Sequence, residues 1–87
     1  MTYCKLLYTF VALIIISEMK LVNKLKILRF NSNQITQEEL AGKMNVSRQT
    51  INAIENGKFN PSVKLALLIS EYFKCNVEDV FYLTKEK

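Results

Sequence analysis

The sequence predicts a compact all-α domain of five short helices. The chain has 87 residues, which is enough for one small domain and too few for two. From about residue 20 onward, apolar residues recur at the three- and four-residue spacing of amphipathic helices. Short polar turns, rich in residues that begin and end helices, separate these segments, and no segment clearly predicts a strand.

The beginning of the chain differs from the rest, because Leu6 to Ile16 is an almost unbroken apolar run. It is shorter than the roughly 20 residues of a membrane-spanning helix, and no small-residue cleavage site follows it as in a secretory signal. The run indicates either an added packing or oligomer-forming element, or upstream sequence before a natural start at Met19. We therefore divide the chain into an apolar extension (1–19), a domain (20–84) and a charged tail (85–87), and expect no membrane partner.

The first predicted helix runs from about Leu21 to Phe30. Leu21, Leu25 and Leu28 recur at helical spacing, with basic residues between them. The polar residues 31–33 are typical of a turn and end this helix.

The second predicted helix occupies about Gln37 to Met44. Thr36 and Glu39 form a capping-box pattern just before and within its first turn. In such a box, the hydroxyl and the carboxylate each bond a free backbone amide at the start of the helix.

Serines begin two of the remaining helices. Ser47 is a good N-cap for a third helix that continues to about Asn56, where Gly57 can take the left-handed conformation that ends it. Ser62 caps a fourth helix, and Val77 to Phe81 makes a short fifth. The fourth helix carries Leu65, Leu68, Ile69, Tyr72 and Phe73.

The composition argues against an enzyme and against a metal or cofactor. The chain contains no histidine, which is both the commonest general base and the commonest metal ligand. Cys4 and Cys75 lie far apart and outside any CxxC motif, so they predict neither a zinc site nor a disulfide framework. Cys75 is expected to be a small buried residue in a reducing, cytoplasmic compartment. The 12 lysines and arginines exceed the 8 acidic residues, and the net charge of +4 permits an anionic partner.

Only Asn45 and Val46 separate the second and third predicted helices. So tight a turn between two short helices is the helix-turn-helix arrangement. Asparagine tolerates the left-handed backbone of this turn better than any residue except glycine. The small Ala41 stands where the two helices cross, and the apolar residues expected in the core are Leu40, Ala41, Met44, Val46, Ile51 and Ile54.

The other face of the third predicted helix is polar and rich in amides. It carries Arg48, Gln49, Thr50, Asn52, Ala53 and Asn56. Guanidinium and amide groups form hydrogen bonds with the edges of bases, so this face is a candidate DNA-reading surface. Any one of these residues, taken alone, is more often an ordinary solvated side chain. The prediction depends on their occurrence together on one helix of a helix-turn-helix.

Several motifs at fixed spacing make the chain resemble the Cro/cI-type (XRE) family of helix-turn-helix regulators, from about Leu21 to Leu83. They are Thr36-Gln37-Glu38-Glu39-Leu40-Ala41, Val46-Ser47-Arg48-Gln49-Thr50-Ile51, Ile54-Glu55-Asn56-Gly57-Lys58 and Asn60-Pro61-Ser62. The chain departs from the pattern in having Asn45 in place of the usual turn glycine and a loop before Gln37 that is one residue longer. The resemblance implies a lambda-repressor-like five-helix domain and an ion pair between Arg29 and Glu55.

The resemblance also implies contacts with double-stranded DNA, because the family places its third helix in the major groove. Base edges would be contacted by Arg48, Gln49, Thr50 and Asn52. Phosphates would be contacted by Gln37, Ser47, Asn56 and Lys58. No residue is expected to be catalytic or to bind a metal.

The expected function is sequence-specific DNA binding by a transcriptional regulator, with repression by operator occupancy. One domain of this size covers only a few base pairs, so we expect a homodimer that reads two half-sites about one DNA turn apart. The N-terminal run or the apolar surface around Val77, Val80, Phe81 and Leu83 could form its interface. An antitoxin that binds a toxin protein is the alternative function.

Overall fold

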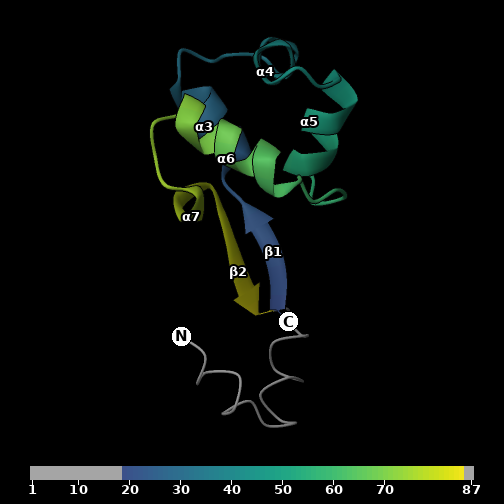
Figure 1. The fold of residues 1–87 in the computed structure, drawn as a ribbon, viewed down its shortest axis with the longest axis vertical. Coiled ribbons are helices and arrows are strands. Elements are labelled where there is room, and N and C mark those ends of the chain that lie inside the picture. Colours follow the sequence, from purple (N-terminus) through teal and green to yellow (C-terminus); the bar gives the residue numbers. More distant parts are fainter. Residues whose placement is uncertain (1–18, 86–87) are drawn as a thin grey trace, which may run out of the picture.

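The computed structural model describes residues 19–85, which form five helices framed by two strands (Figure 1). The apolar run from Leu6 to Ile16 and the last two residues lie outside this range. In chain order the elements are β1 (Met19–Asn23), α3 (Leu25–Asn31), α4 (Gln37–Met44), α5 (Arg48–Glu55), α6 (Val63–Tyr72), α7 (Val77–Val80) and β2 (Phe81–Lys85).

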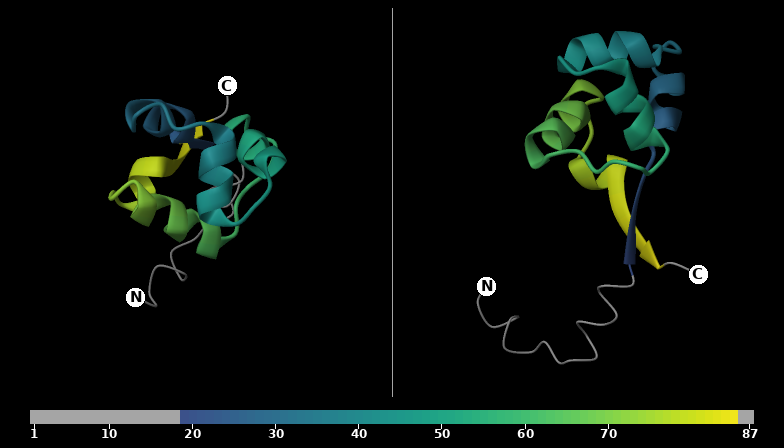
Figure 2. Two further views of the ribbon diagram at one scale, coloured as in Figure 1. Left: turned by 90° about the horizontal axis from the view of Figure 1, so that it is seen from above. Right: turned by 90° about the vertical axis from the view of Figure 1, so that its right-hand side faces the viewer.

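The two strands correct the expectation of a purely helical fold. β1 and β2 pair antiparallel, with Leu21 opposite Leu83 and Asn23 opposite Phe81. The resulting ribbon extends away from α4 and α5, as the right-hand view of Figure 2 shows. Strand pairing joins the two ends of the domain, and the spacing of apolar residues within either end alone does not reveal it.

The first helix begins at Leu25 and not at Leu21, because Asn23 redirects the chain. The Asn23 side-chain oxygen accepts a hydrogen bond from the Leu25 amide at 3.0 Å, and its Nδ2 donates to the Ile54 carbonyl at 2.9 Å. The amide of Lys24 donates to the Val80 carbonyl at 2.9 Å, which holds the end of β1 beside α7. The contacts with Ile54 and Val80 come from distant parts of the chain and override the helical spacing of Leu21 and Leu25.

The predicted helix caps are confirmed. Thr36 and Glu39 form the capping box of α4, with side chain to backbone distances of 3.0 and 2.9 Å. The hydroxyls of Ser47 and Ser62 each accept a hydrogen bond from the backbone amide three residues later. Asn45 is left-handed, with a φ of 60° and a ψ of 43°, as the turn requires.

The core lies between α3, α4, α5, α6 and α7 (Figure 2). Six side chains are fully buried: Leu25, Leu40, Ile51, Ile54, Ile69 and Val80. Ala41 is also buried, whereas Met44 and Val46 are half-buried and pack against the core. Four predicted core residues are thus confirmed as buried, and the other two lie at the rim of the core.

Cys75 is half-buried against the core, so it is less enclosed than the sequence suggested. Burial raises the pKa of its thiol, and the carboxylate of Asp79 raises it further. At neutral pH the side chain is therefore a protonated, weakly nucleophilic thiol.

Between Met19 and Lys85, no helix has the length and apolar character needed to cross a membrane.

Candidate nucleic-acid interface

The helix α5 has one buried and one exposed face. Ile51 and Ile54 are 0% and 1% exposed, so they fix the helix against the core. Arg48, Gln49 and Asn52 are exposed and together line a hollow of about 310 Å³. The structure thus brings three of the four predicted base-contacting residues to one open surface.

The fourth predicted base-contacting residue, Thr50, belongs to the cap of α5. It is half-buried, and its hydroxyl lies 2.9 Å from the hydroxyl of Ser47. The Ser47 oxygen also accepts a hydrogen bond from the Thr50 amide at 3.1 Å. Ser47 and Thr50 therefore hold one another at the start of the helix, and each keeps only part of its hydrogen-bonding capacity for a partner.

The starts of α4 and α5 lie beside one another. A second hollow, of about 480 Å³, is lined by residues from both starts and from α3: Arg29, Thr36, Gln37, Glu38 and Arg48. The guanidinium of Arg48 and the first-turn backbone amides of α4 are features that suit an anion such as a phosphate, whereas the carboxylate of Glu38 in the same wall opposes one. Gln37, predicted to bind phosphate, thus lies near Arg48, predicted to bind a base.

An ion pair fixes the end of α5 to α3. Arg29 Nε donates to Glu55 Oε2 at 2.8 Å, and Arg29 Nη2 donates to Glu55 Oε1 at 3.3 Å. The two side chains are 17% and 2% exposed. Arg29 Nη1 also donates to the Ile35 carbonyl at 2.9 Å, so the guanidinium also holds the loop before α4. The pair implied by the resemblance is confirmed, and the longer loop does not disturb it.

Three predicted DNA-contacting amides are hydrogen-bonded in series. Gln37 Nε2 donates to Glu55 Oε1 at 2.9 Å, Asn52 Nδ2 donates to Gln37 Oε1 at 3.3 Å, and Asn56 Nδ2 donates to Asn52 Oδ1 at 3.1 Å. No pattern in the sequence predicts the contacts of Gln37, which join residues 15 and 18 positions apart. Only the contact between Asn52 and Asn56, which lie four residues apart, could be predicted from the sequence among the bonds of this series.

Lys58 lies just beyond α5 and is exposed. Gly57 takes a left-handed φ of 74°, and the Lys58 amide then donates back to the Ala53 carbonyl at 2.9 Å. This is the helix ending that the glycine predicted. It places the lysine at the end of the exposed face of α5.

The geometry defines a helix-turn-helix DNA-binding protein, in which α4 and the turn at Asn45 present the polar face of α5. The helix-turn-helix family matches residues 25–80 of the chain. The chain belongs to the Cro/cI-type (XRE) helix-turn-helix family of transcriptional regulators, which bind DNA and are not enzymes.

Relatives with this name occur in archaea and bacteria. An uncharacterized HTH-type transcriptional regulator of Methanocaldococcus jannaschii is 56% identical over 59 residues, which are 68% of this chain and 88% of the relative. The Bacillus subtilis regulator YgzD, also uncharacterized, is 45% identical over 64 residues, or 74% of this chain and 96% of YgzD.

A solved structure has the same fold. The crystal structure of the transcriptional regulator VanUg matches with a TM-score of 0.63 and 22% identity, over 79% of this chain and 91% of that one.

Proposed function

We propose that this protein represses transcription by binding a specific operator, with α5 in the major groove. The observation that carries the proposal is the common exposed surface of Arg48, Gln49 and Asn52, opposite the buried isoleucines of the same helix. In this orientation a guanidinium can pair with guanine and the amides with adenine. Thr50 completes the proposed base-contacting set from its place beside the helix cap.

The phosphate contacts in this proposal surround the base-reading surface. Gln37 lies at the start of α4 and Ser47 at the start of α5, where backbone amides are free to bind an anion. Asn56 and Lys58 are exposed at the opposite end of α5. Contacts at both ends of a helix would fix its register on the duplex without reading sequence.

Selection of bound duplexes from a random pool tests the proposal. We expect one preferred sequence, and we expect Arg48→Ala and Gln49→Ala to lose preference at separate base pairs. Each lost bidentate contact is worth about 1–3 kcal/mol of discrimination. Lys20→Ala in β1 removes the same charge as Arg48→Ala from the distant ribbon and should keep the preference. Selection of no sequence by the wild-type chain would refute the proposal.

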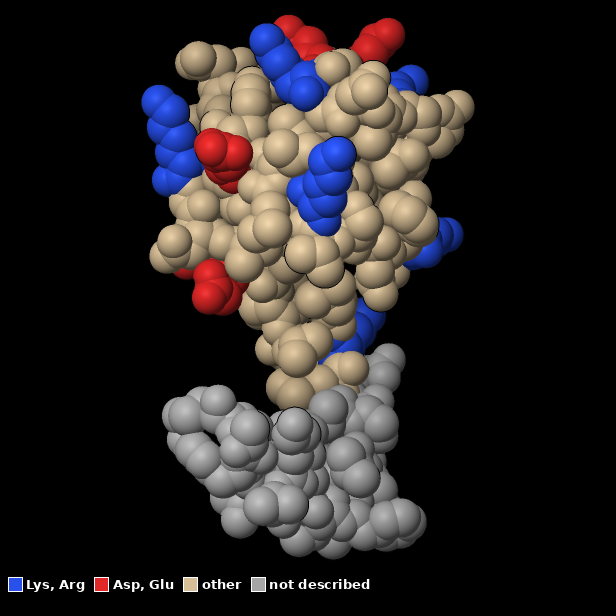
Figure 3. Space-filling model, in the orientation of Figure 1, with Lys and Arg blue, Asp and Glu red and all other residues tan. Residues whose placement is uncertain are grey.

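We further propose that a homodimer reads the operator, joined through the exposed face of α6. Val63, Leu67, Leu68 and Tyr72 are 76%, 52%, 40% and 36% exposed, a concentration of apolar surface that suits an interface. This helix faces the viewer in Figure 3, where most of the surface is uncharged. Val80, which the sequence suggested for this role, is fully buried in the core.

The sequence of α6 is complementary to a second copy running in the opposite direction. The midpoint of the helix falls between Leu67 and Leu68, so an antiparallel copy would place these leucines against one another. It would also place Lys64 opposite Glu71. A twofold interface needs this reciprocity, because each residue meets its partner twice.

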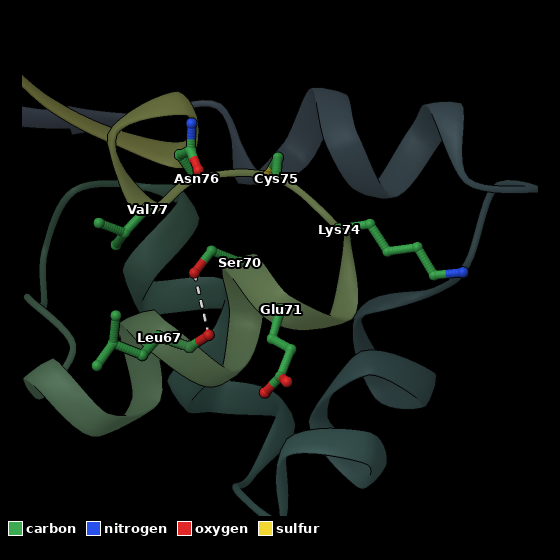
Figure 4. A pocket seen from close by; sticks show the side chains of 7 residues that line it. All are labelled: Leu67, Ser70, Glu71, Lys74, Cys75, Asn76 and Val77. Atoms are coloured by element: carbon green, nitrogen blue, oxygen red, sulfur yellow. Dashed lines mark hydrogen bonds between the residues drawn. The ribbon is translucent and has the colours of Figure 1, made fainter.

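A groove beside α6 extends this surface toward α7. Figure 4 shows Leu67 and Val77 on one side of the groove and Glu71 and Lys74 on the other. The groove measures about 650 Å³ and contains Cys75 and Asn76 in its wall. An apolar rim beside charges of both signs is a further feature that suits association with another copy of the chain.

Sedimentation equilibrium tests the dimer. Leu67→Glu should shift the protein to monomer, whereas Ile27→Glu, at a position 59% exposed on α3, should leave the dimer intact. Lys64→Glu alone should weaken association, and the double change Lys64→Glu with Glu71→Lys should restore it. A wild-type protein that stays monomeric at high concentration would contradict the proposed dimer and leave the proposed DNA-contacting surface untouched.

The antitoxin alternative has no comparable support, because the relatives are named as transcriptional regulators.

A further inference from the structure

The carboxylate of Glu55 accepts three hydrogen bonds at the base of the DNA-binding surface. Two come from Arg29, at 2.8 and 3.3 Å, and one comes from Gln37, at 2.9 Å. The Glu55 side chain is 2% exposed. An ionised carboxylate only accepts hydrogen bonds, so the group that faces it must be a donor.

This requirement fixes which end of the Gln37 amide points inward. Its NH₂ group faces Glu55, and its oxygen is therefore the atom that accepts from Asn52 Nδ2 at 3.3 Å. The Asn52 oxygen in turn accepts from Asn56 Nδ2 at 3.1 Å. An isolated side-chain amide can flip at little cost. Flipping any amide of this series would instead place two acceptors or two donors against one another.

We propose that Glu55 is a positioning residue for DNA recognition, which sets the orientation of the Gln37 and Asn52 amides through this series. The inference rests on the proposed function. Each of these two amides uses its oxygen and one N–H within the series, which leaves one N–H free. The free N–H of each amide is therefore held in one orientation, beside an oxygen that keeps its second lone pair. This N–H suits acceptors such as phosphate oxygens or the N7 of a purine.

A purely structural role of the pair between Arg29 and Glu55 leads to a different expectation. If Arg29 and Glu55 only hold α3 to α5, then changing Glu55 lowers stability, and DNA binding by the molecules that remain folded is unaltered. If Glu55 acts through Gln37, then changing either residue disturbs the same contacts. The two effects on DNA affinity would then not add.

The test is a double-mutant cycle of Glu55→Gln and Gln37→Ala, with affinity for the selected duplex measured by fluorescence anisotropy on protein shown by circular dichroism to be folded. We expect each single change to weaken binding about fivefold or more. In the Gln37→Ala background, Glu55→Gln should weaken it by less than about twofold. Multiplicative effects, or wild-type affinity of folded Glu55→Gln, would overturn the proposal.

Glu78→Gln is the matched control, because it removes the same charge from an exposed residue of α7, outside the proposed DNA-contacting set. It should keep the base preference of the wild type, whereas Glu55→Gln should relax the preference at the pair nearest Asn52.

If Glu55→Gln does not fold, Gln37→Met keeps the inference testable, because it interrupts the series without touching the ion pair. It should relax the preference near Asn52 and keep the preference set by Gln49, and an unchanged preference at both would refute the inference. Failure of the wild-type chain to select any duplex would refute the proposed function itself.

Discussion

The helices α5 and α6 begin and end in the same way but present opposite kinds of surface. Both start at a serine whose hydroxyl accepts a hydrogen bond from an amide in the first turn, and both are followed by a left-handed residue. The exposed face of α5 is polar and hydrogen-bonded, whereas that of α6 is apolar. Local capping thus decides where a helix lies in the sequence, and the outward side chains decide which partner it suits.

The largest expected effect separates the buried face of α5 from the exposed face of α6. Ile54→Ala should lower the free energy of unfolding by about 2–5 kcal/mol, because it leaves a cavity at a side chain that is 1% exposed. Leu67→Ala, at a side chain 52% exposed, should cost less than about 1 kcal/mol. Urea unfolding at a concentration where the chain is monomeric gives both values. Equal losses would mean that α6 is packed as deeply as α5.

The lysines beyond the two helices should differ in their effect on DNA. Lys58→Ala should weaken binding to all duplexes alike and lower the slope of log affinity against log salt by about one, as expected for one phosphate contact. Lys74→Gly removes the same charge after α6 and should leave the slope unchanged. Titrations at several salt concentrations measure this, and equal slopes for the two variants would show that Lys58 does not contact the duplex.

The two serine caps should have similar effects on stability and different effects on DNA binding. Ser47→Ala and Ser62→Ala should each cost about 1 kcal/mol, because each leaves a first-turn amide without its acceptor. Only Ser47→Ala should also weaken DNA binding, since Ser47 stands at the start of the proposed reading helix. Thermal unfolding combined with anisotropy distinguishes them. If the Ser62→Ala variant is a folded dimer and still binds DNA more weakly, the start of α6 also contributes to the DNA-binding surface.

The last comparison, with effects no larger than those of the caps, concerns the left-handed residues after the helices. Gly57 has a φ of 74°, and Lys74 has a φ of 58°, although lysine disfavours this region. Gly57→Ala should therefore cost about 1 kcal/mol, whereas Lys74→Gly should stabilise the protein by at most about 1 kcal/mol. Differential scanning calorimetry on both variants checks the opposite signs.

Much of the helical framework could be predicted because it depends on neighbours in the chain. The cap residues Thr36, Ser47 and Ser62 bond amides only three positions away, and the left-handed turn at Asn45 is a property of that residue and its φ. The prediction was wrong where a distant segment decided the outcome. The spacing of Leu21, Leu25 and Leu28 predicted a helix from Leu21, yet residues 21–23 pair with residues 81–83 as a strand.

The sequence by itself determined the class of protein, the positions of the helix-turn-helix caps and the polar face of α5. Its motifs also implied the ion pair of Arg29 with Glu55, which tertiary packing formed at 2.8 Å. Only the tertiary structure decided the β-ribbon, the exposure of the α6 leucines and the orientation of the Gln37, Asn52 and Asn56 amides. The physical reason is that capping and periodicity act over a few residues, whereas strand pairing, burial and side-chain hydrogen bonding depend on groups that only folding brings together.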